Sequence, residues 1–538
     1  MQSRRGSVVS LTVLLSVFCP LAASGGDWPR WCGPGGRNFS GERPLPAAFA
    51  RGKRKSDGSV DLSAARNVKW AVRLCSVVYG NPTIADGRVF LGANNGAVRG
   101  EKRFRSMRGG VVQCRRETTG KLLWQLFVPH LEEKHLPPRS NLKSHNWGVC
   151  SSPTVEGDRL YVVTNAADVL CLDVHGLANG NDGPFQDEAQ YMTGKDRKPL
   201  ELTDRDGDII WRFDLMKDIG IVPHDAVSSS TLLHGDMLYV TTSNSVDNSH
   251  RKVPNPDAAS LIVLDKRTGR LVATDNEKMG HRLYHGLWSS PVKGEASGRT
   301  LIFFGGGDGV CYAFEPVAKA GEKPKHLKKV WWYDCNPPHY KFRDGKPIDY
   351  YQGDKRKARK YGDKGNKNDG TYVGPSQIIA TPVFHEGRVY LAIGQDPAHG
   401  RGKGMLHCID ATKTGEITKT GKVWSYDGLD RSISTVAVAD GLVYAPDIAG
   451  RLHCVDADTG KCYWVHETRH EAWGAPLVAD GKVYFNTRRS FWILAAGKRK
   501  KVLYVERRVG SEASPVAANG VLYVVLKGWL WALRSAAP

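Results

Sequence analysis

Histidine and tryptophan residues recur in this sequence shortly before short, β-prone segments. An imidazole can bind metals or exchange protons near neutral pH, and an indole offers an aromatic face and one N–H donor. A further group of polar residues follows another such segment. The whole set comprises His145, Trp147, His224, Asp225, His285, Trp288, Gln395, Asp396, His399, His470 and Trp473. We predict that these residues bind a ligand or a metal ion at a shared site, on condition that the fold brings them together. The alternative is that they make loop hydrogen bonds and pack between structural units.

Other patterns that could carry chemistry are weaker. Asp204, Asp206 and Asp208 alternate as the oxygen ligands of a Ca²⁺ loop do, but Leu215 stands where such a loop has its bidentate glutamate. We interpret this segment as a polar hairpin. The sequence has no phosphate-binding glycine loop, no Gly-x-Ser-x-Gly elbow and no His-Glu-x-x-His motif. We therefore assign no catalytic residues and no individual metal ligands.

The sequence contains 11 cysteines, one of them in the apolar N-terminal segment. Four of them occupy equivalent positions in the third strand of an internal repeat, and we expect them to act as small buried hydrophobic residues: Cys114, Cys171, Cys408 and Cys454. Equivalent positions of neighbouring sheets lie about 10 Å apart, too far for a disulfide. Partners for the other six, Cys32, Cys75, Cys150, Cys311, Cys335 and Cys462, cannot be read from the sequence, and none has zinc-ligand spacing.

An internal repeat supplies the elements that would position these residues. Eight segments share a small-residue stretch, a glycine turn, a β-prone strand, a strand ending in Asp, a Thr-Gly-Lys turn and a strand containing Trp, for example Trp124, Trp211, Trp332, Trp424 or Trp464. Turn pairs such as Asp86-Gly87 supply the positive φ of tight hairpins. The segment at 288–304 has a longer first turn. Four short antiparallel strands, repeated in this way, predict an all-β, eight-bladed β-propeller.

The last repeat predicts how the ring closes. After residues 521–531 the chain ends without a fourth strand, whereas residues 68–72 form a spare strand near the other end. We expect the N- and C-terminal strands to pair, so that the propeller spans residues 65–535 and leaves no open sheet edge.

The Asp-x-x-Thr-Gly-Lys-x-x-Trp repeat resembles that of the PQQ-repeat propellers. This family includes quinoprotein alcohol dehydrogenases and the propeller subunit of the outer-membrane β-barrel assembly machinery. Residues 27–34, 243–248 and 394–400 are similar to segments of exported bacterial PQQ-like propellers. The resemblance covers roughly residues 27–535 and implies the fold.

The resemblance also implies which groups a quinoprotein enzyme would need to bind and use its cofactor. PQQ would lie between a tryptophan and a disulfide of adjacent cysteines, beside Ca²⁺ held by carboxylate and amide oxygens and an aspartate base. The sequence has no Cys-Cys pair, and no motif assigns the base or the Ca²⁺ ligands. We therefore expect no cofactor, with PQQ and Ca²⁺ as the alternative.

The N-terminus predicts export. Residues 1–24 combine Arg4 and Arg5, an apolar run at 8–18 and small residues at 21–24, as in a secretory signal peptide. Export by the general or the twin-arginine route stays open, and residues 25–64 form an N-terminal extension. No other stretch has 18 apolar residues, so we expect a periplasmic or extracellular chain with no transmembrane segment once the signal is removed.

The formal net charge of +21 indicates the partners. Basic surfaces attract polyanions, and for an exported protein these are anionic polysaccharide or lipid rather than nucleic acid. A basic insertion at 334–372, with the run Lys355-Arg356-Lys357-Ala358-Arg359-Lys360, is either a solvated loop or such a contact. We predict a monomeric, non-catalytic binding or scaffold module of the cell envelope. It would contact a protein or an anionic glycan or lipid through its loops and axial funnel. The alternative is a PQQ- and Ca²⁺-dependent oxidoreductase of the alcohol dehydrogenase type.

Overall fold

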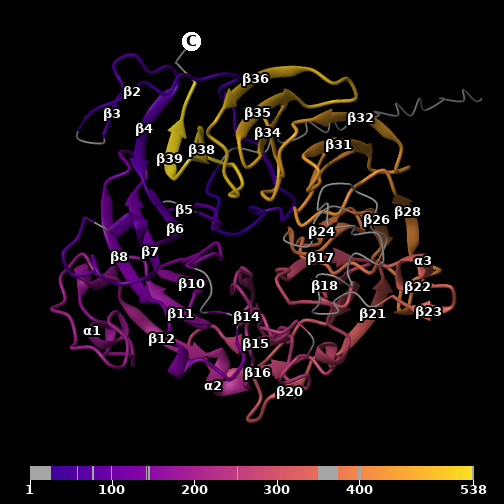
Figure 1. Ribbon diagram of the computed structural model, residues 1–538, viewed down its shortest axis with the longest axis horizontal. Coiled ribbons are helices and arrows are strands. Elements are labelled where there is room, and N and C mark those ends of the chain that lie inside the picture. The colour runs from indigo at the N-terminus through magenta and orange to yellow at the C-terminus, as the bar shows by residue number, and fades with distance from the viewer. Residues whose placement is uncertain are drawn as a thin grey trace, which may run out of the picture.

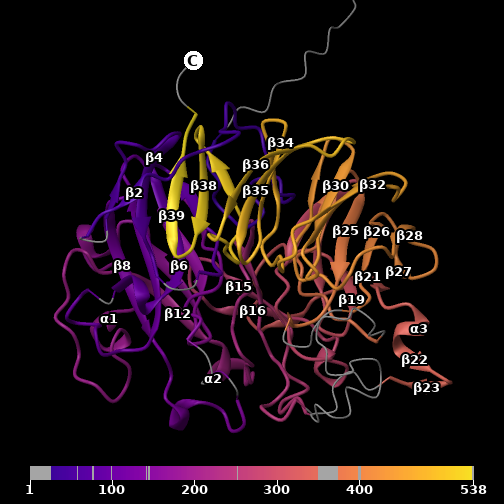
Figure 2. The ribbon, with the colours of Figure 1, turned by 45° about the horizontal axis from the view of Figure 1, so that its top comes forward.

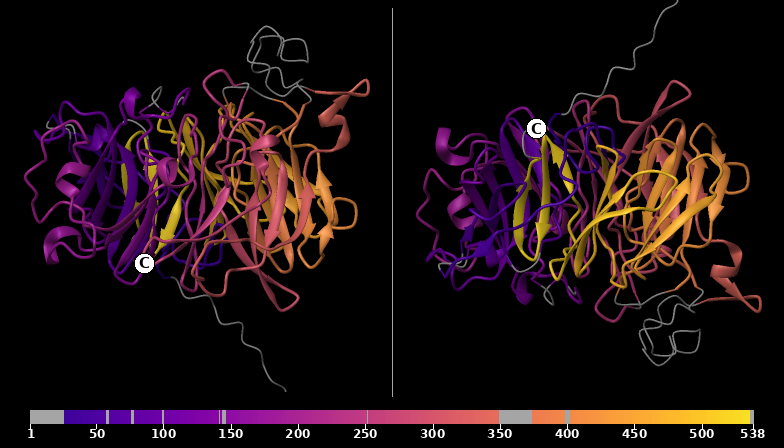
Figure 3. Two further views of the ribbon diagram at one scale, coloured as in Figure 1. Left: turned by 90° about the horizontal axis from the view of Figure 1, so that it is seen from below. Right: turned by 90° about the horizontal axis from the view of Figure 1, so that it is seen from above.

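Eight β-sheets surround a central axis as the blades of a propeller (Figure 1). The computed structural model describes residues 26–56, 59–75, 78–98, 100–140, 142, 146–250, 252–348, 374–397 and 402–535. In each blade four antiparallel strands follow one another outward from the axis, which confirms the predicted fold class. Seen edge-on, the blades form a thick disc (Figure 3).

The blades are numbered in chain order of their innermost strands. Blade 1 consists of β5 (Thr83–Ala85), β6 (Arg88–Asn94), β7 (Gly109–Arg116) and β8 (Leu122–Pro129), and blade 2 consists of β9 (Thr154–Glu156), β10 (Arg159–Val163), β11 (Asp168–Asp173) and β12 (Ile209–Asp214). Blade 3 consists of β13 (Leu232–His234), β14 (Met237–Thr241), β15 (Leu261–Asp265) and β16 (Leu271–Thr274), and blade 4 consists of β17 (Val292–Ala296), β18 (Arg299–Gly305), β19 (Val310–Phe314) and β21 (Lys329–Asp334). Blade 5 consists of β24 (Val383–His385), β25 (Arg388–Ile393), β26 (Met405–Asp410) and β28 (Lys422–Tyr426), and blade 6 consists of β29 (Ala437–Ala439), β30 (Leu442–Pro446), β31 (Arg451–Asp456) and β32 (Cys462–Glu467). Blade 7 consists of β33 (Leu477–Ala479), β34 (Lys482–Asn486), β35 (Ser490–Ala495) and β36 (Val502–Arg507), and blade 8 consists of β37 (Val516–Ala518), β38 (Val521–Leu526), β39 (Trp529–Leu533) and β4 (Val68–Arg73).

Short elements decorate the ring. The two-residue strands are β1 (Phe39–Ser40), β2 (Lys53–Arg54), β3 (Val60–Asp61), β20 (Lys325–His326), β22 (Phe342–Arg343), β23 (Lys346–Pro347) and β27 (Gly415–Glu416), and the α-helices are α1 (Glu188–Tyr191), α2 (Leu215–Ile219) and α3 (Pro338–Lys341). In the described part of the chain, no helix has the length and apolar character needed to cross a membrane.

A two-residue turn joins the first two strands of each blade. In six blades both turn residues have positive φ, the type I′ combination that matches strand twist; five of these pairs are Asp86-Gly87, Glu386-Gly387, Asp440-Gly441, Asp480-Gly481 and Asn519-Gly520. Ser297 and Gly298 do the same in blade 4, with φ of 51° and 71°. The prediction of a longer first turn in blade 4 is therefore wrong. The extra residues instead lengthen β17, which has five residues where the other first strands have three.

A tryptophan on the outer strand docks most blades onto the next one. Its indole Nε1 donates to a backbone carbonyl beyond the neighbouring third strand over 2.8–3.2 Å, in the pairs Trp70–Glu117, Trp124–Val174, Trp211–Lys266, Trp331–Ala411, Trp424–Ala457 and Trp464–Gly497. The rings of Trp70, Trp124, Trp211 and Trp424 also cover a glycine of the next blade so closely that a Cβ on Gly120, Gly176, Gly269 or Gly460 would lie 2.6–2.8 Å from the ring. In blade 4 this residue is the buried Trp331, and not Trp332 as the repeat pattern suggested.

The termini close the ring in blade 8. Strand β4 pairs antiparallel with β39, with Arg73 opposite Trp529 and Ala71 opposite Trp531. Figures 1 and 2 show the C-terminal yellow strand beside the N-terminal indigo one. The predicted closure by N- and C-terminal strands is confirmed.

The segment before β4 crosses the axis. Trp28 pairs with Ile84 in blade 1, whereas the indole of Trp31 donates to Thr381 of blade 5 over 2.8 Å. Further on, β1 pairs in parallel with β33 of blade 7, and Ser40 Oγ donates to the carbonyl of Ala517 in blade 8. Because these partners lie on different sides of the ring, residues 28–40 close one end of the axial channel.

Nine of the ten described cysteines are buried and all ten are free. The four at the third-strand position are at most 1% exposed and pack within the blades. The prediction that they act as small hydrophobes is confirmed.

Trp70 tests the docking of blade 8 onto blade 1. Replacing it with alanine removes a buried indole and the Nε1 bond to Glu117, so Trp70→Ala is expected to lower the free energy of unfolding by about 3–5 kcal/mol in denaturant titrations. Arg73→Ala, at an exposed position of the same strand, should change it by less than about 0.5 kcal/mol. Equal stabilities of the two variants would contradict this role.

Candidate functional site

Each blade places one residue at the axis, and these residues form a belt. The axial belt consists of Asn81, Ser152, Ser230, Ser290, Thr381, Thr435, Ala475 and Ser514. A backbone N–H of one blade donates to the belt side chain of the next: Ser152 to Ser230, Ser230 to Ser290 and Thr381 to Thr435, each over 2.9 Å. Because these side chains are short, the backbones can approach closely and the belt narrows the channel.

A second set of residues, two positions earlier in each blade, forms the wall of a funnel above the belt. These are Tyr79, Cys150, Ser228, Trp288, Ile379, Ile433, Trp473 and Glu512. In an extended chain, residues two apart point to the same side, so both sets face the axis. The funnel is a cavity of about 590 Å³.

Five of the predicted site residues line this funnel: Trp147, Asp225, Trp288, Asp396 and Trp473. The structure therefore brings them to one cavity, although they come from five separate repeats. The sequence reasoning missed Trp31, Tyr79, Glu471, Arg488 and Glu512, which line it too. Aligning the eight repeats at the belt position would have found Tyr79 and Glu512, because they stand two residues before it.

Aromatic contacts organise one side of the funnel. The ring of Tyr79 meets that of Trp147 edge-on at 5.3 Å between centroids and that of Trp473 at 5.7 Å. Burial, and then the charge of Glu512, raises the pKa of Tyr79 well above its usual value, so its phenol stays neutral. Trp288 is held in place by its indole Nε1, which donates to the carbonyl of Ala226 over 2.9 Å.

The described lining of the funnel is acidic. It carries four carboxylates, Asp225, Asp396, Glu471 and Glu512, against one guanidinium, Arg488. Arg488 lies over the ring of Trp473 at 5.2 Å and forms ion pairs with Glu512 at 3.1 Å and Glu471 at 3.4 Å. The funnel thus opposes the net charge of the chain, and its one guanidinium is already paired.

The other predicted residues lie elsewhere. His224 and His285 are buried behind the funnel wall, where they contact His250, a residue the sequence analysis did not select. Burial, and then the charge of His224, lowers the pKa of His250 to about 4. Gln395 is buried and His470 is half-buried, and neither lines the funnel. His145 and His399 lie outside the described residues.

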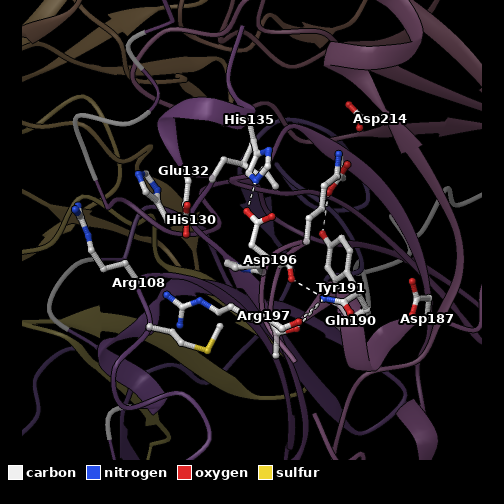
Figure 4. Close-up of a pocket in the computed structure, with 18 of the residues that line it drawn as sticks. Arg108, His130, Glu132, His135, Asp187, Gln190, Tyr191, Asp196, Arg197 and Asp214 are labelled. Atoms are coloured by element: carbon white, nitrogen blue, oxygen red, sulfur yellow. Dashed lines mark hydrogen bonds and ion pairs between the residues drawn. The ribbon is translucent and has the colours of Figure 1, made fainter. Parts of the chain in front are cut away.

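A second cavity, of about 460 Å³, lies at the rim of the ring between blades 1 and 2 and the insertion after β11 (Figure 4). Its polar wall includes His135, whose Nε2 lies 2.6 Å from Asp196, and Gln190, which donates to the carbonyl of Arg197 over 2.9 Å.

Asp168 is the buried carboxylate of this cavity. Arg212 Nε donates to it over 2.7 Å and the hydroxyl of Tyr191 over 3.0 Å. Burial nevertheless outweighs these contacts and raises the pKa of Asp168 to about 6.

The carboxylates of the calcium-like segment make internal contacts. Asp206 accepts two hydrogen bonds from Arg103, and Asp208 accepts one from the backbone N–H of Asp182. Asp173, Asp182 and Asp208 each offer one carboxylate oxygen within 4.8 Å of the other two. Residues 204 and 205 form a turn, and Asp206 pairs in parallel with Gln125 of β8, so the segment is a turn before β12 and not the polar hairpin that we expected.

Comparison with known families decides the relationship. The family profile described as outer membrane protein assembly factor BamB matches residues 108–276 and 402–536, more than half of the chain. The chain belongs to the PQQ-repeat propeller family. This confirms the resemblance inferred from the repeats.

Individual members of the PQQ-repeat family are distant from this chain. Quinohemoprotein alcohol dehydrogenase ADH IIB of Pseudomonas putida is 22% identical over 419 residues, 75% of this chain and 52% of the relative. The chain thus spans about half the length of this curated relative. A europium-containing methanol dehydrogenase has a similar fold, with a TM-score of 0.53 and 12% identity over 94% of this chain and 91% of its own. BamB from Moraxella catarrhalis is 14% identical over 87% of this chain and 97% of its own, with a TM-score of 0.49.

The raised pKa of Asp168 predicts a pH dependence of stability. The folded chain holds this proton up to about pH 6, whereas the unfolded chain releases it near pH 4, so stability falls as pH rises through this window. Relative to Asp168→Asn, the parent should lose roughly 3 kcal/mol of unfolding free energy between these pH values. Denaturant titrations across the window measure the difference. Tyr191→Phe keeps the carboxyl and should keep the pH dependence, and identical curves for the parent and Asp168→Asn would contradict the assignment.

Proposed function

We propose that this chain is a non-catalytic binding module of the cell envelope whose axial funnel takes a cationic group of its partner. The observation that carries the proposal is the lining of the funnel, which combines five aromatic side chains with four carboxylates and one paired guanidinium. Aromatic faces and carboxylates together favour ammonium or guanidinium groups.

The funnel already contains one example of this interaction. Arg488 stacks on Trp473 while Glu471 and Glu512 neutralise it. Trp147 and Trp288 add two aromatic rings to the same funnel, and Asp225 and Asp396 add two carboxylates. A lysine or arginine side chain of an envelope protein, or a small organic ammonium, has the charge and shape for this position. An anionic glycan or lipid has the wrong sign for the funnel and suits the basic outer loops instead.

Localisation and assembly belong to the same proposal. Residues 1–24 have the layout of a signal peptide, and we place the chain in the periplasm or outside the cell, as a monomer. The basic run at 355–360 lies outside the described residues, and we assign it the contact with an anionic surface.

A PQQ- and Ca²⁺-dependent oxidoreductase is the second candidate, favoured by the relationship to quinohemoprotein alcohol dehydrogenase. The described funnel residues fit these groups poorly. PQQ is a polycarboxylate and would face four carboxylates and one guanidinium that is already paired. Cys150 lines the funnel without an adjacent cysteine to complete the disulfide cap.

Benzyltrimethylammonium tests the proposed funnel site. We expect it to quench tryptophan fluorescence saturably, whereas benzoate, a matched aromatic anion, should leave it unchanged. Glu471→Gln and Trp473→Ala should each weaken binding about tenfold, because each removes one element of the cation site. Glu156→Gln, an exposed residue paired with Lys266 outside the funnel, is the control and should bind as the parent does. Equal binding of benzoate, or unchanged affinity in both funnel variants, would refute the cationic partner.

Reconstitution separates the two candidate functions. Purified chain incubated with PQQ and Ca²⁺ should show neither a stoichiometric shift of cofactor absorbance nor alcohol-dependent dye reduction. If both signals appear in the parent and disappear in Trp473→Ala, the oxidoreductase replaces the binding module as the function of the funnel.

A further inference from the structure

Three histidines from different segments meet behind the funnel wall. His224 precedes β13, His250 follows β14, and His285 precedes β17, so blades 3 and 4 both contribute. The ring centroids are 4.4 Å apart for His224 and His250, 4.8 Å for His224 and His285, and 5.1 Å for His250 and His285. One ring nitrogen of each lies within 4.8 Å of the other two.

The neighbours of His224 determine which of its nitrogens can act as a ligand. Its Nδ1 lies 3.0 Å from the carbonyl oxygen of Val246, and because a carbonyl only accepts, Nδ1 carries the proton and donates. The lone pair is therefore on Nε2. A backbone carbonyl that fixes the tautomer in this way is the usual support of a metal-bound histidine.

A carboxylate lies beside the same nitrogen. Asp225 Oδ1 is 3.6 Å from His224 Nε2, and Asp225 also lines the funnel. Its φ of 58° and that of His250, 57°, are left-handed values that residues with side chains seldom adopt. Such backbone conformations persist where the surrounding structure enforces them, often at functional sites.

We propose that His224, His250, His285 and Asp225 bind a divalent transition-metal ion in the wall of the funnel. Four ligand atoms around a tetrahedral ion stand about 3.3 Å apart, given metal–nitrogen bonds of about 2.0–2.1 Å. The three imidazole nitrogens lie within 4.8 Å of one another, and Asp225 Oδ1 lies 3.6 Å from His224 Nε2, so side-chain rotations would bring the four ligand atoms to this spacing. Neutral imidazoles with one carboxylate suit zinc, copper, iron or nickel rather than calcium or magnesium.

The histidine site is more enclosed than the carboxylate group of Asp173, Asp182 and Asp208, in which Asp182 is exposed. His224 and His285 are at most 1% exposed, so water competes little with an ion there. The ring of Trp288, which lines the funnel, meets that of His285 edge-on with 5.1 Å between centroids, and His285 itself does not line the funnel. Only Asp225 belongs to both places. The two sites share Asp225, but the test of the cationic ligand uses Glu471 and Trp473 whereas the test of the metal uses the histidines, so failure of one proposal can be told from failure of the other.

Cobalt titration of the untagged, full-length chain, freed of metal with EDTA and dialysed, tests the proposal. We expect one Co²⁺ per chain, with the visible absorption bands of a four-coordinate ion that Zn²⁺ displaces. His250→Gln and His285→Gln should each weaken binding at least a hundredfold, and Asp225→Asn about tenfold. The exposed His281, which lies 3.0 Å from Asp257 away from the cluster, provides the control variant His281→Gln, whose affinity should match the parent's.

Two further measurements check that each variant is folded and that the metal ion stabilises the chain. Near-ultraviolet circular dichroism of the metal-free variants checks that each is folded, and the half-buried His250 position keeps the test valid if His285→Gln does not fold. Zn²⁺ should raise the unfolding temperature of the parent and of His281→Gln only. No stoichiometric Co²⁺ binding, unchanged affinity in His250→Gln, or the intense charge-transfer band of a cobalt thiolate would each overturn the proposal.

Discussion

The docking of an outer-strand tryptophan onto the next blade is the contact on which this ring depends. A single four-stranded blade buries little surface alone, so its stability comes from its neighbours. Each of the six docking indoles donates a hydrogen bond to a backbone carbonyl of the next blade, and those of Trp70, Trp124, Trp211 and Trp424 also cover a glycine there. Where the tryptophan is missing, other groups take its place. At blade 3 the Tyr239 hydroxyl accepts from the backbone of Val317, and at blade 7 Tyr504 donates to the carbonyl of Phe49.

The docking of each blade onto the next holds the eight first strands around the axis, where the residues that precede these strands line the funnel. Small residues at the belt let eight backbones approach one another, while the position two residues earlier is free to vary. Tyr79, Trp288, Trp473 and Glu512 use that freedom to line the funnel. The same geometry leaves room behind the wall, where loops of blades 3 and 4 bring His224, His250 and His285 together.

The fold could be predicted from the sequence because each blade repeats its own turn and docking residues. Closure through β4 could be predicted too, since the last repeat lacks a strand that residues 68–72 supply. The residues that line the funnel could be predicted from the sequence only in part. Trp147 and Trp473 stand out as repeated aromatics, but Trp31 enters from the N-terminal extension and no repeat indicates it. His250 belongs to a long loop after β14, and its approach to His224 depends on a local φ of 57° that the sequence does not specify.

The segment that crosses the axis has a consequence for the order of assembly. Ser40 and Glu42 bind Ala517, Asn519 and Gly520, which lie 477 or 478 residues further along the chain. The N-terminal segment leaves the ribosome first, yet its binding surface exists only when blade 8 has its final strands. Contacts of such long sequence separation form late in folding. A chain truncated before residue 517 would therefore lack both the closed ring and these contacts, and residues 28–42 act as a latch that is complete only when blade 8 has formed.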